Sequence, residues 1–223
     1  MSVTKLNAGS STFRMFEGQI SSLSYSQSEI IADIMHLYTS GKIDCDPCFN
    51  RGTMYGGLTT PVLKFDIKPI APGVVQADAR NLPLTAGEIE SMIIDPPFLI
   101  GTSSNKMSDR FGSYPTLYML QDAYNEFLCE AFRVLSTNGI LIFKLQDQIH
   151  DRRKYFISHF VINQAHSIGF NIIDEFILLN KARISSDQGK QAASRVFHSK
   201  FLVFRKQRGR RKYILEQKGG SHV

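Results

Sequence analysis

Apolar residues follow two alternating patterns along the chain, short continuous apolar runs and longer stretches with a helical period. Short apolar runs bounded by turn residues are typical of buried strands, and apolar positions spaced i, i+3, i+4, i+7 indicate amphipathic helices. The alternation of the two predicts an α/β fold, with a mostly parallel sheet covered by helices on both faces. The predicted strands are 42–45, 61–66, 73–78, 91–95, 140–145, 170–179 and 197–204, and the predicted helices are 25–38, 120–135 and 155–168.

Two of these helices are followed by residues that favour helix termination. Asn138-Gly139 follows the stretch 120–135, and Gly169 follows 155–168. Both residue types adopt the left-handed conformation that commonly ends a helix. The last two strands are joined by the polar segment 180–196, which lacks a helical pattern, so we expect them to form an antiparallel pair at one edge of the sheet.

Composition excludes several classes of protein. The 223 residues include 43% hydrophobic residues, 16 Phe and 8 Tyr, which supports one folded domain and excludes a disordered chain. No apolar run reaches the roughly eighteen residues of a membrane helix, and the N-terminus lacks a signal pattern, so we expect no membrane contact and a cytoplasmic location. Three cysteines argue against a disulfide framework. Cys45-x-x-Cys48 has no second pair or His cluster beside it, so no metal site is expected.

The net charge of +6 is concentrated at the C-terminus. The segment 205–223 carries seven Lys or Arg and one Glu, whereas residues 1–204 carry nineteen charges of each sign. A basic tail can bind phosphate backbones, although such tails also serve solubility alone. We therefore divide the chain into an N-terminal extension (1–23), a folded domain (24–206) and a basic C-terminal tail (207–223).

Carboxylates follow four successive predicted strands. They are Asp44 with Asp46, then Asp66, Asp78 and Asp95. The carboxyl ends of parallel strands meet at one edge of a sheet, where α/β proteins bind ligands. A single acid there is commonly a helix cap, but four in series favour a ligand with several donors, such as an amine, a ribose diol and an exocyclic amino group. The glycine loops of dinucleotide and nucleoside-triphosphate sites do not occur, so the pattern favours an adenosine ligand without phosphates.

The segment Asp95-Pro96-Pro97-Phe98 is the most specific motif. Two consecutive prolines fix two φ values and remove two N–H donors, so we expect the carbonyls there to accept hydrogen bonds from a ligand beside the Asp95 carboxylate. Phe98 offers a flat face for stacking. A planar amine, such as adenine N6 or cytosine N4, can donate one hydrogen to each acceptor. The alternative interpretation is a strand terminator followed by a core phenylalanine.

These motifs resemble those of the class I S-adenosylmethionine-dependent methyltransferases, specifically the group that methylates amino groups of nucleic-acid bases. Asp95-Pro96-Pro97-Phe98 matches the catalytic [D/N/S]-P-P-[Y/F/W] motif. The segment Asp46–Thr53 is similar to the D-P-F-x-G-x-G-T cofactor loop, with Asn50 where the family usually has glycine; asparagine tolerates left-handed φ. Tyr25–Ser28 resembles the N-terminal helix motif, and 195–206 resembles the last strand of many bacterial and phage DNA methyltransferases.

The resemblance, over residues 24–206, implies a Rossmann-like class I methyltransferase fold, with a mostly parallel seven-stranded sheet and a C-terminal antiparallel hairpin strand. It implies direct methyl transfer, in which Asp95 and the Pro96 carbonyl draw the amine toward tetrahedral geometry and Phe98 stacks on an extruded base. Catalytic roles thus fall on Asp95, Pro96, Pro97 and Phe98. S-adenosylmethionine is the implied cofactor, with Asp66 on its ribose and Asp78 on its adenine amino group. The implied cofactor-binding residues are Gln27, Ser28, Asp46, Pro47, Gly52, Asp66 and Asp78.

Nucleic acid is the implied partner, and the chain has no room for a separate recognition domain, which leaves a homodimer or a recognition partner open. Basic residues in the loops 99–115 and 181–200, at the end of the fifth strand and in the tail are candidate contacts, although each is alternatively a solvated residue. These residues are Lys106, Arg110, Lys144, Arg183, Arg195, Arg210 and Arg211. We expect a DNA amino-methyltransferase acting on adenine N6. The alternatives are a ribosomal RNA guanine-N2 or adenine-N6 enzyme, a DNA cytosine-N4 enzyme, or a catalytically silent nucleic-acid-binding module.

Overall fold

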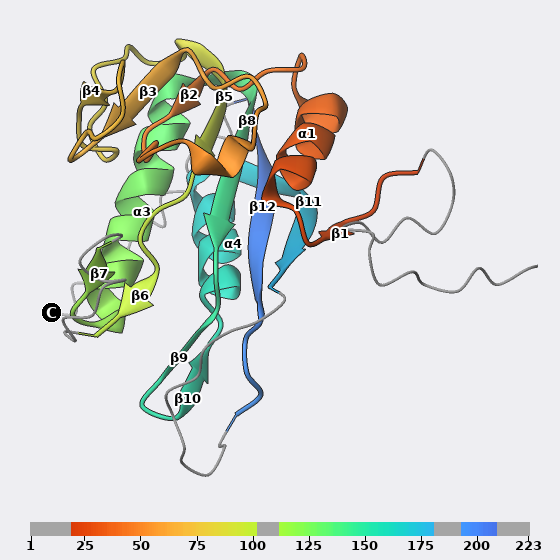
Figure 1. Cartoon of the computed structure of the whole chain (residues 1–223). Coiled ribbons are helices and arrows are strands. Elements are labelled where there is room, and N and C mark those ends of the chain that lie inside the picture. Colours follow the sequence, from red (N-terminus) through yellow and green to blue (C-terminus); the bar gives the residue numbers. More distant parts are fainter. Residues whose placement is uncertain (1–18, 102–111, 181–192, 209–223) are drawn as a thin grey trace, which may run out of the picture.

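A computed structural model describes residues 19–101, 112–180 and 193–208, which form one central sheet with helices on both faces (Figure 1). The helices are α1 (Gln27–Tyr38), α3 (Leu117–Val134) and α4 (Ile157–Ile168), with a short 3-10 helix η1 (Thr53–Tyr55). The strands of the sheet are β1 (Leu23–Ser24), β2 (Cys45–Asp46), β3 (Leu63–Asp66), β4 (Val75–Gln76), β5 (Ile89–Ile94), β8 (Leu135–Leu145), β11 (Phe170–Leu179) and β12 (His198–Lys206). Two small strand pairs lie beside it, the parallel pair β6 (Leu99–Ile100) and β7 (Ser113–Tyr114), and the antiparallel pair β9 (Gln148–His150) and β10 (Arg153–Tyr155).

The strand order is β1-β11-β12-β8-β5-β2-β3-β4. Every pair is parallel except those of β12, which runs antiparallel to both β11 and β8. The predicted α/β fold and the antiparallel pairing of the last two strands are therefore confirmed. The sheet has eight strands rather than the predicted seven, because Leu23 and Ser24 pair with Ile177 and Leu178 of β11.

The two faces of β8 show why the sheet is covered on both sides. Side chains alternate along a strand, so Ile140 and Ile142 pack in the same cluster as α1, whereas Leu141 and Phe143 pack with α3 and α4. All four side chains are buried. An apolar face on each side of the same strand requires a helix on each side of the sheet.

α1 and α3 begin at capping residues, but α3 does not end where the sequence predicts. Ser26 and Thr116 accept hydrogen bonds from the N–H groups of Glu29 and Met119, at the starts of α1 and α3. The prediction that Asn138-Gly139 ends the second helix is wrong, since α3 ends at Val134 and Asn138 is a left-handed residue (φ 67°) within β8. No helix in the described residues is long and apolar enough to cross a membrane.

Candidate active site

The proline motif lies at the centre of the sheet, immediately after β5. β5 pairs with β2 on one side and β8 on the other. From β2 the chain continues outward through β3 and β4, and from β5 it continues through β8 in the opposite direction. The carboxyl ends of β2 and β5 are therefore the point at which strand order reverses, which is where open α/β sheets bind ligands.

Two contacts hold the segment Asp95-Pro96-Pro97-Phe98 in place. The Lys144 Nζ atom at the end of β8 lies 2.6 Å from Asp95 Oδ2, and the Lys144 side chain is only 12% exposed. The hydroxyl of the buried Tyr124 of α3 donates to the Pro97 carbonyl at 3.0 Å. The prediction that the carbonyls of this turn stay free is therefore wrong for Pro97. Lys144, predicted among the nucleic-acid contacts, lies against Asp95 instead.

The loop after β2 adopts the turn that the sequence predicts. Asp46 is fully buried, and its carboxylate accepts hydrogen bonds from the Cys48 N–H at 2.9 Å and from the Tyr55 hydroxyl at 2.8 Å. Asn50 (φ 51°) and Gly52 (φ 65°) are both left-handed, so asparagine does replace the expected glycine at the first of these positions. A Cβ atom at Gly52 would collide with the ring of Phe49.

Asp66 and α1 both join this loop. Asp66, at the end of β3, accepts from the N–H groups of Asn50 and Lys68 at 2.9 and 2.8 Å, and so ties two strand ends together. Ser28, in the first turn of α1, packs closely on Gly56. A Cβ atom added at Gly56 would lie 2.8 Å from the Ser28 hydroxyl oxygen. Of the predicted residues, Asp46, Pro47 and Gly52 thus belong to this loop, and Ser28 and Asp66 contact it.

The carboxylates at this edge influence one another electrostatically. Burial raises the pKa of Asp46 to about 7, and the hydrogen bonds from Cys48 and Tyr55 oppose this only in part, while the charges of Asp95 and Asp66 add to it. Burial, followed by the same three carboxylates, raises the pKa of the Cys48 thiol well above its usual range. Asp46, Asp66 and Asp95 therefore converge on one region, as the sequence predicts. A concentration of negative charge in a buried site favours a cationic ligand.

Asp78 lies further out and already has a partner. Arg80 holds the Asp78 carboxylate through its backbone N–H and two guanidinium nitrogens, the shortest contact being 2.6 Å, and keeps the pKa of Asp78 below its usual range. Arg80 also contacts Glu126 of α3 at 3.2 Å. An adenine amino group would have to share this carboxylate with Arg80.

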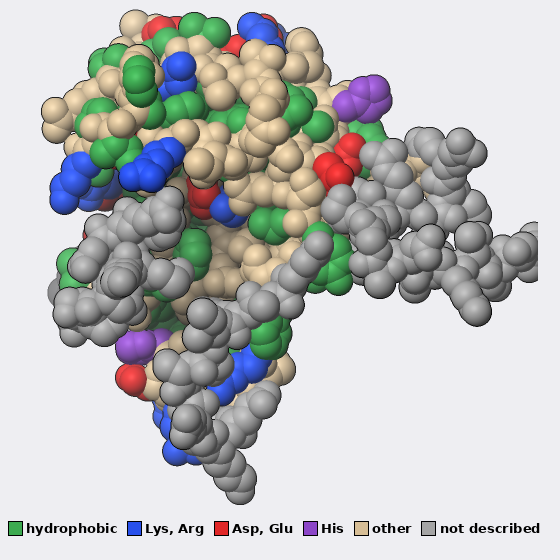
Figure 2. Space-filling model, viewed as in Figure 1, with side chains coloured by type: hydrophobic (Ala, Val, Ile, Leu, Met, Phe, Trp, Pro, Cys, Tyr) green, Lys and Arg blue, Asp and Glu red, His purple; other side chains and the backbone are tan. Residues whose placement is uncertain are grey.

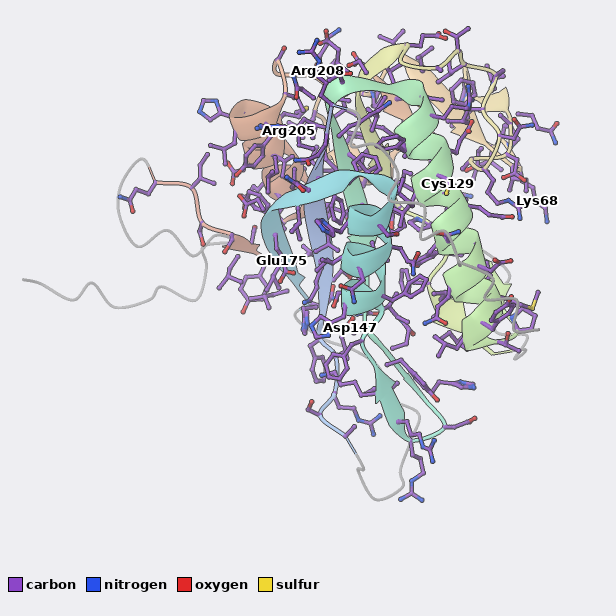
Figure 3. The ribbon with its side chains drawn as sticks, turned by 180° about the vertical axis from the view of Figure 1, so that it is seen from behind. Lys68, Cys129, Asp147, Glu175, Arg205 and Arg208 are labelled. Carbon is purple, nitrogen blue, oxygen red and sulfur yellow. The ribbon has the colours of Figure 1, made fainter. Side chains whose placement is uncertain are left out.

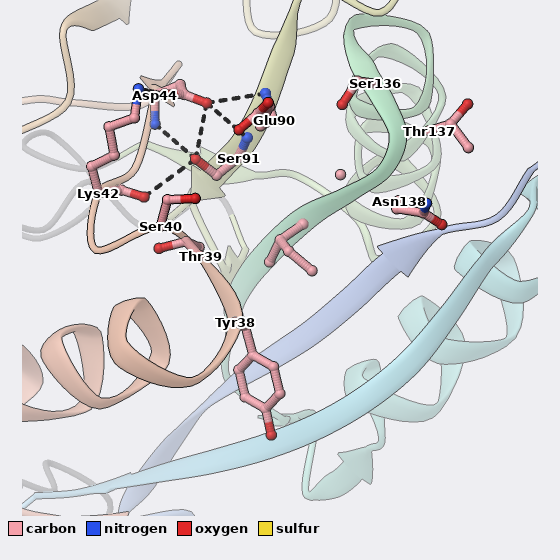
Figure 4. A pocket seen from close by; sticks show the side chains of 12 residues that line it. Tyr38, Thr39, Ser40, Lys42, Asp44, Glu90, Ser91, Ser136, Thr137 and Asn138 are labelled. Carbon is pink, nitrogen blue, oxygen red and sulfur yellow. Dashed lines mark hydrogen bonds and ion pairs between the residues drawn. The ribbon is translucent and has the colours of Figure 1, made fainter.

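Asp44 lies at the opposite edge of the sheet, so the prediction that it joins the other acids is wrong. Because β2 is Cys45–Asp46, Asp44 precedes the strand rather than ending it. Its carboxylate pairs with Lys42 at 3.0 Å and accepts from the N–H groups of Glu90 and Ser91. Figure 4 shows this network beside a polar pocket at the amino ends of β5 and β8.

Most of the other residues predicted to contact nucleic acid lie outside the described part of the chain. Lys106, Arg110, Arg183, Arg210 and Arg211 lie outside the described residues, and Arg195 is partly buried. Sequence reasoning missed Tyr55 and Tyr124, since both match ordinary core positions. No group of three His, Cys, Asp or Glu side chains that could hold a metal occurs in residues 19–101, 112–180 and 193–208.

Comparisons with known proteins indicate the fold. No family model and no curated protein matches the chain. Among solved structures, a 1,6-didemethyltoxoflavin-N1-methyltransferase from Burkholderia thailandensis, with S-adenosylhomocysteine bound, is 12% identical with a TM-score of 0.53; the match covers 82% of this chain and 80% of that one. A proposed DNA modification methylase from Thermus thermophilus, in complex with S-adenosyl-L-methionine, is 17% identical with a TM-score of 0.42, over 63% of this chain. TrmN from Thermus thermophilus is 16% identical with a TM-score of 0.47, over 83% of this chain.

The chain spans only part of two of these proteins, 57% of the length of the Thermus DNA modification methylase and 50% of TrmN. The Burkholderia enzyme matches over most of both chains, and β12 lies antiparallel between β11 and β8 in an otherwise parallel sheet. The chain therefore has the Rossmann-like fold of the S-adenosylmethionine-dependent methyltransferases.

Proposed function

We propose that the protein is an S-adenosylmethionine-dependent methyltransferase that acts on an exocyclic amino group of a base in DNA, with adenine N6 as its target. The observation that carries this proposal is the position of Asp95-Pro96-Pro97-Phe98 at the carboxyl end of β5, beside the buried Asp46 loop. The hydrogen-bond acceptors for a planar amine thus lie next to the carboxylates that would attract a cationic cofactor.

The described residues fit S-adenosylmethionine by their chemistry. The cofactor carries a positive sulfonium, and the charges of Asp66 and Asp95 lie close enough to Asp46 to raise its pKa, so a cation bound there would be stabilised. An ionised carboxylate accepts about four hydrogen bonds, so Asp66, which accepts two backbone bonds, retains capacity for a ribose diol. Support also comes from the Burkholderia enzyme, which has the same fold and was solved with S-adenosylhomocysteine. The cofactor would be held by Gln27, Ser28, Asp46, Pro47, Gly52, Asp66 and Asp78.

The cofactor supplies an electrophilic methyl group when bound, and the protein's residues prepare the amine that attacks it. Asp95 and the Pro96 carbonyl accept the two amine hydrogens, which frees the nitrogen lone pair. Lys144 occupies only Oδ2 of Asp95, so it fixes the orientation of the carboxylate while the other oxygen can accept from the amine. Tyr124 fixes the turn through Pro97. Phe98 stacks on the extruded base, and about 1–3 kcal/mol of stacking offsets much of the few kcal/mol that extrusion costs.

Asp95→Ala tests the proposal. The variant loses the carboxylate acceptor, so we expect methyl transfer to fall at least about 100-fold while the folded protein still binds the cofactor. The assay incubates the protein and cofactor with DNA or RNA and quantifies methylated nucleosides after digestion. Unchanged turnover in Asp95→Ala would contradict the mechanism. N2-methylguanine or N4-methylcytosine as the product would replace the adenine assignment.

A silent nucleic-acid-binding module is the second candidate, and the ion pair of Lys144 with Asp95 is the observation that favours it. In such a protein, Lys144 would permanently neutralise the carboxylate that an enzyme needs as an acceptor. Turnover by the wild type distinguishes the two, and in an active enzyme Lys144→Met should lower that turnover because Asp95 loses its orienting partner. A silent module transfers no methyl group with either residue at position 144, and calorimetry with S-adenosylmethionine shows whether it still binds the cofactor.

A further inference from the structure

A basic hairpin projects from the carboxyl edge of the sheet (Figure 1). It consists of β9 and β10, which pair antiparallel with Arg153 opposite His150 and Lys154 opposite Ile149. Asp151 (φ 48°) and Arg152 (φ 62°) form its turn, and two consecutive left-handed residues give the twist that a tight hairpin requires. The sequence Asp151-Arg152-Arg153-Lys154 therefore occupies the tip, and three of its four residues are cationic.

The two arginines at the tip face solvent. Asp151, Arg152 and Arg153 are exposed, and Figure 2 shows Lys and Arg side chains gathered on this arm. Within the described part of the chain, neither Arg152 nor Arg153 forms an ion pair. Asp151 contacts His150 at 3.4 Å rather than either arginine. Arg152, Arg153 and Lys154 still leave the tip with a net positive charge. Unpaired surface cations that are close together are suited to phosphate oxygens.

Aromatic rings continue this surface from the hairpin to α4. Phe156 is 53% exposed and stacks on His159, with the ring centroids 5.3 Å apart and the planes 16° from parallel. Lys154 Nζ lies 5.6 Å from the centre of the Phe156 ring. An exposed ring beside cations is the combination with which proteins hold single-stranded nucleic acid, since bases stack on the ring while cations follow the backbone.

The base of the hairpin is fixed to the candidate active site. β9 begins four residues after Lys144, and the connection is buried. The Gln146 amide donates to the His198 carbonyl at 2.9 Å, and Asp147 accepts from the Ser158 N–H at 2.9 Å. On the other side, β9 packs on β6, which follows Phe98 directly. The position of the hairpin is therefore determined relative to Asp95.

We propose that the β9–β10 hairpin is a nucleic-acid-binding arm, in which Arg152 and Arg153 contact backbone phosphates and Phe156 stacks on an unpaired base next to the target. This inference rests on the proposed function, because it assigns the substrate strand of the same site. It also supplies contacts that the predicted basic residues do not include.

The test compares two double variants that remove equal charge from opposite ends of the sheet. Arg152→Gln with Arg153→Gln alters the hairpin, and Lys42→Gln with Arg205→Gln is the matched control. Lys42 and Arg205 are also exposed and lie at the opposite edge of the sheet, Lys42 beside Asp44 and Arg205 far from Asp147 at the base of the hairpin (Figure 3). Binding of labelled duplex DNA, single-stranded DNA and single-stranded RNA is measured by fluorescence anisotropy over a range of salt concentrations.

We expect the hairpin variant to bind at least about tenfold more weakly, and its slope of log affinity against log salt on duplex DNA to fall by about 1.8, because two phosphate contacts are lost. The control should stay within about twofold of wild type. Equal losses in both variants, or wild-type binding by the hairpin variant, would overturn the proposal. Equally tight binding of poly-glutamate by the wild type would overturn the nucleic-acid assignment.

Phe156→Leu tests the stacking role separately. It should weaken binding of the single strands by about tenfold and change duplex affinity less, and unchanged single-strand affinity would remove Phe156 from the arm. Calorimetry with S-adenosylmethionine keeps the two proposals distinct. A hairpin variant that binds the cofactor normally but has lost nucleic-acid affinity supports the arm, whereas a wild type that binds nucleic acid but no cofactor refutes the proposed function and leaves the arm intact.

Discussion

Asp46 is the site residue whose charge depends most on pH near neutrality. Its raised pKa of about 7 has burial as its main cause. The unfolded chain gives up this proton near the ordinary value of 3.8, so the folded protein holds more protons between about pH 4 and pH 7. On its own, Asp46 therefore makes the unliganded protein less stable as pH rises through that range.

Cofactor binding should show the opposite dependence on pH. A cationic ligand favours the ionised form of Asp46, so S-adenosylmethionine should bind up to about tenfold more tightly at pH 8 than at pH 6. Calorimetry at both pH values measures this ratio. Asp46→Asn cannot titrate at this position, so it should lose most of the difference. A ratio that is equal in the variant and the wild type would exclude Asp46 as its source.

Sequence reasoning brings Asp46, Asp66 and Asp95 together because each follows a parallel strand, and parallel strands end at a common edge. It could not predict the ion pair of Asp95 with Lys144. That contact depends on the register of β5 and β8, where Ile94 pairs with Phe143 and the next residue of each strand meets the other. Register between distant strands is set by packing rather than by local pattern. The same limit explains Asp44, since a shift in the start of β2 moves it to the other edge.

At the scale of elements, α3 ends on a contact from a distant strand. Lys206 of β12 donates to the carbonyls of Phe132 and Leu135, at 2.5 and 2.6 Å, and its ammonium lies 4.5 Å from the centre of the Phe132 ring. A cation at a helix C-terminus satisfies carbonyls that lack partners within the helix. This contact stabilises the end of α3 at Val134, which lies before the local termination signal at Asn138-Gly139.

Lys206→Met should therefore destabilise the protein. The variant keeps an aliphatic side chain but removes two hydrogen bonds from a charged donor. We expect the free energy of unfolding, measured by urea denaturation, to fall by about 1–3 kcal/mol. The neighbouring Arg205→Met serves as control, since a change at an exposed position usually costs less than about 0.5 kcal/mol. Equal effects in the two variants would show that Lys206 does not stabilise the end of α3.

The β9–β10 hairpin is the element that the sequence pattern conceals. Its turn, Asp151-Arg152, lacks the glycine that usually marks a two-residue hairpin. The apolar residues after it match the helical period, so a helix is predicted from residue 155, whereas α4 begins at Ile157 and Tyr155 ends β10. Short strands contain too few residues for a period of two to be detected. At Tyr155 the pairing of β10 with β9 overrides the helical pattern of the sequence.

For the molecule as a whole, the strands at both margins of the sheet are very short. β1 and β4 have two residues each, whereas β8, β11 and β12 have nine or more. β1 covers β11 through its parallel pairing, and the Ile177 N–H donates to the Ser22 carbonyl at 2.7 Å. A long strand at a margin presents unpaired N–H and C=O groups, and β1 limits that exposure on β11.

Removing β1 should therefore promote self-association. A chain that begins at residue 25 uncovers the β11 backbone at Ile177 and Leu178, whereas one that begins at residue 19 keeps β1. We expect the shorter chain to elute as larger species in size-exclusion chromatography with light scattering, with the excess growing with protein concentration. Identical profiles for the two truncations would show that β1 does not protect this edge.

The brevity of β1 and β4 has a consequence for assembly. A foreign strand gains affinity by forming many successive main-chain hydrogen bonds with an edge strand. An edge strand of two residues offers only the first of these bonds. Templated growth into fibrils is therefore disfavoured along β1 and β4, even though β8 and β12 inside the sheet are long and apolar. Recruitment of another macromolecule must then proceed through side-chain chemistry, which can be altered one residue at a time without disturbing the scaffold.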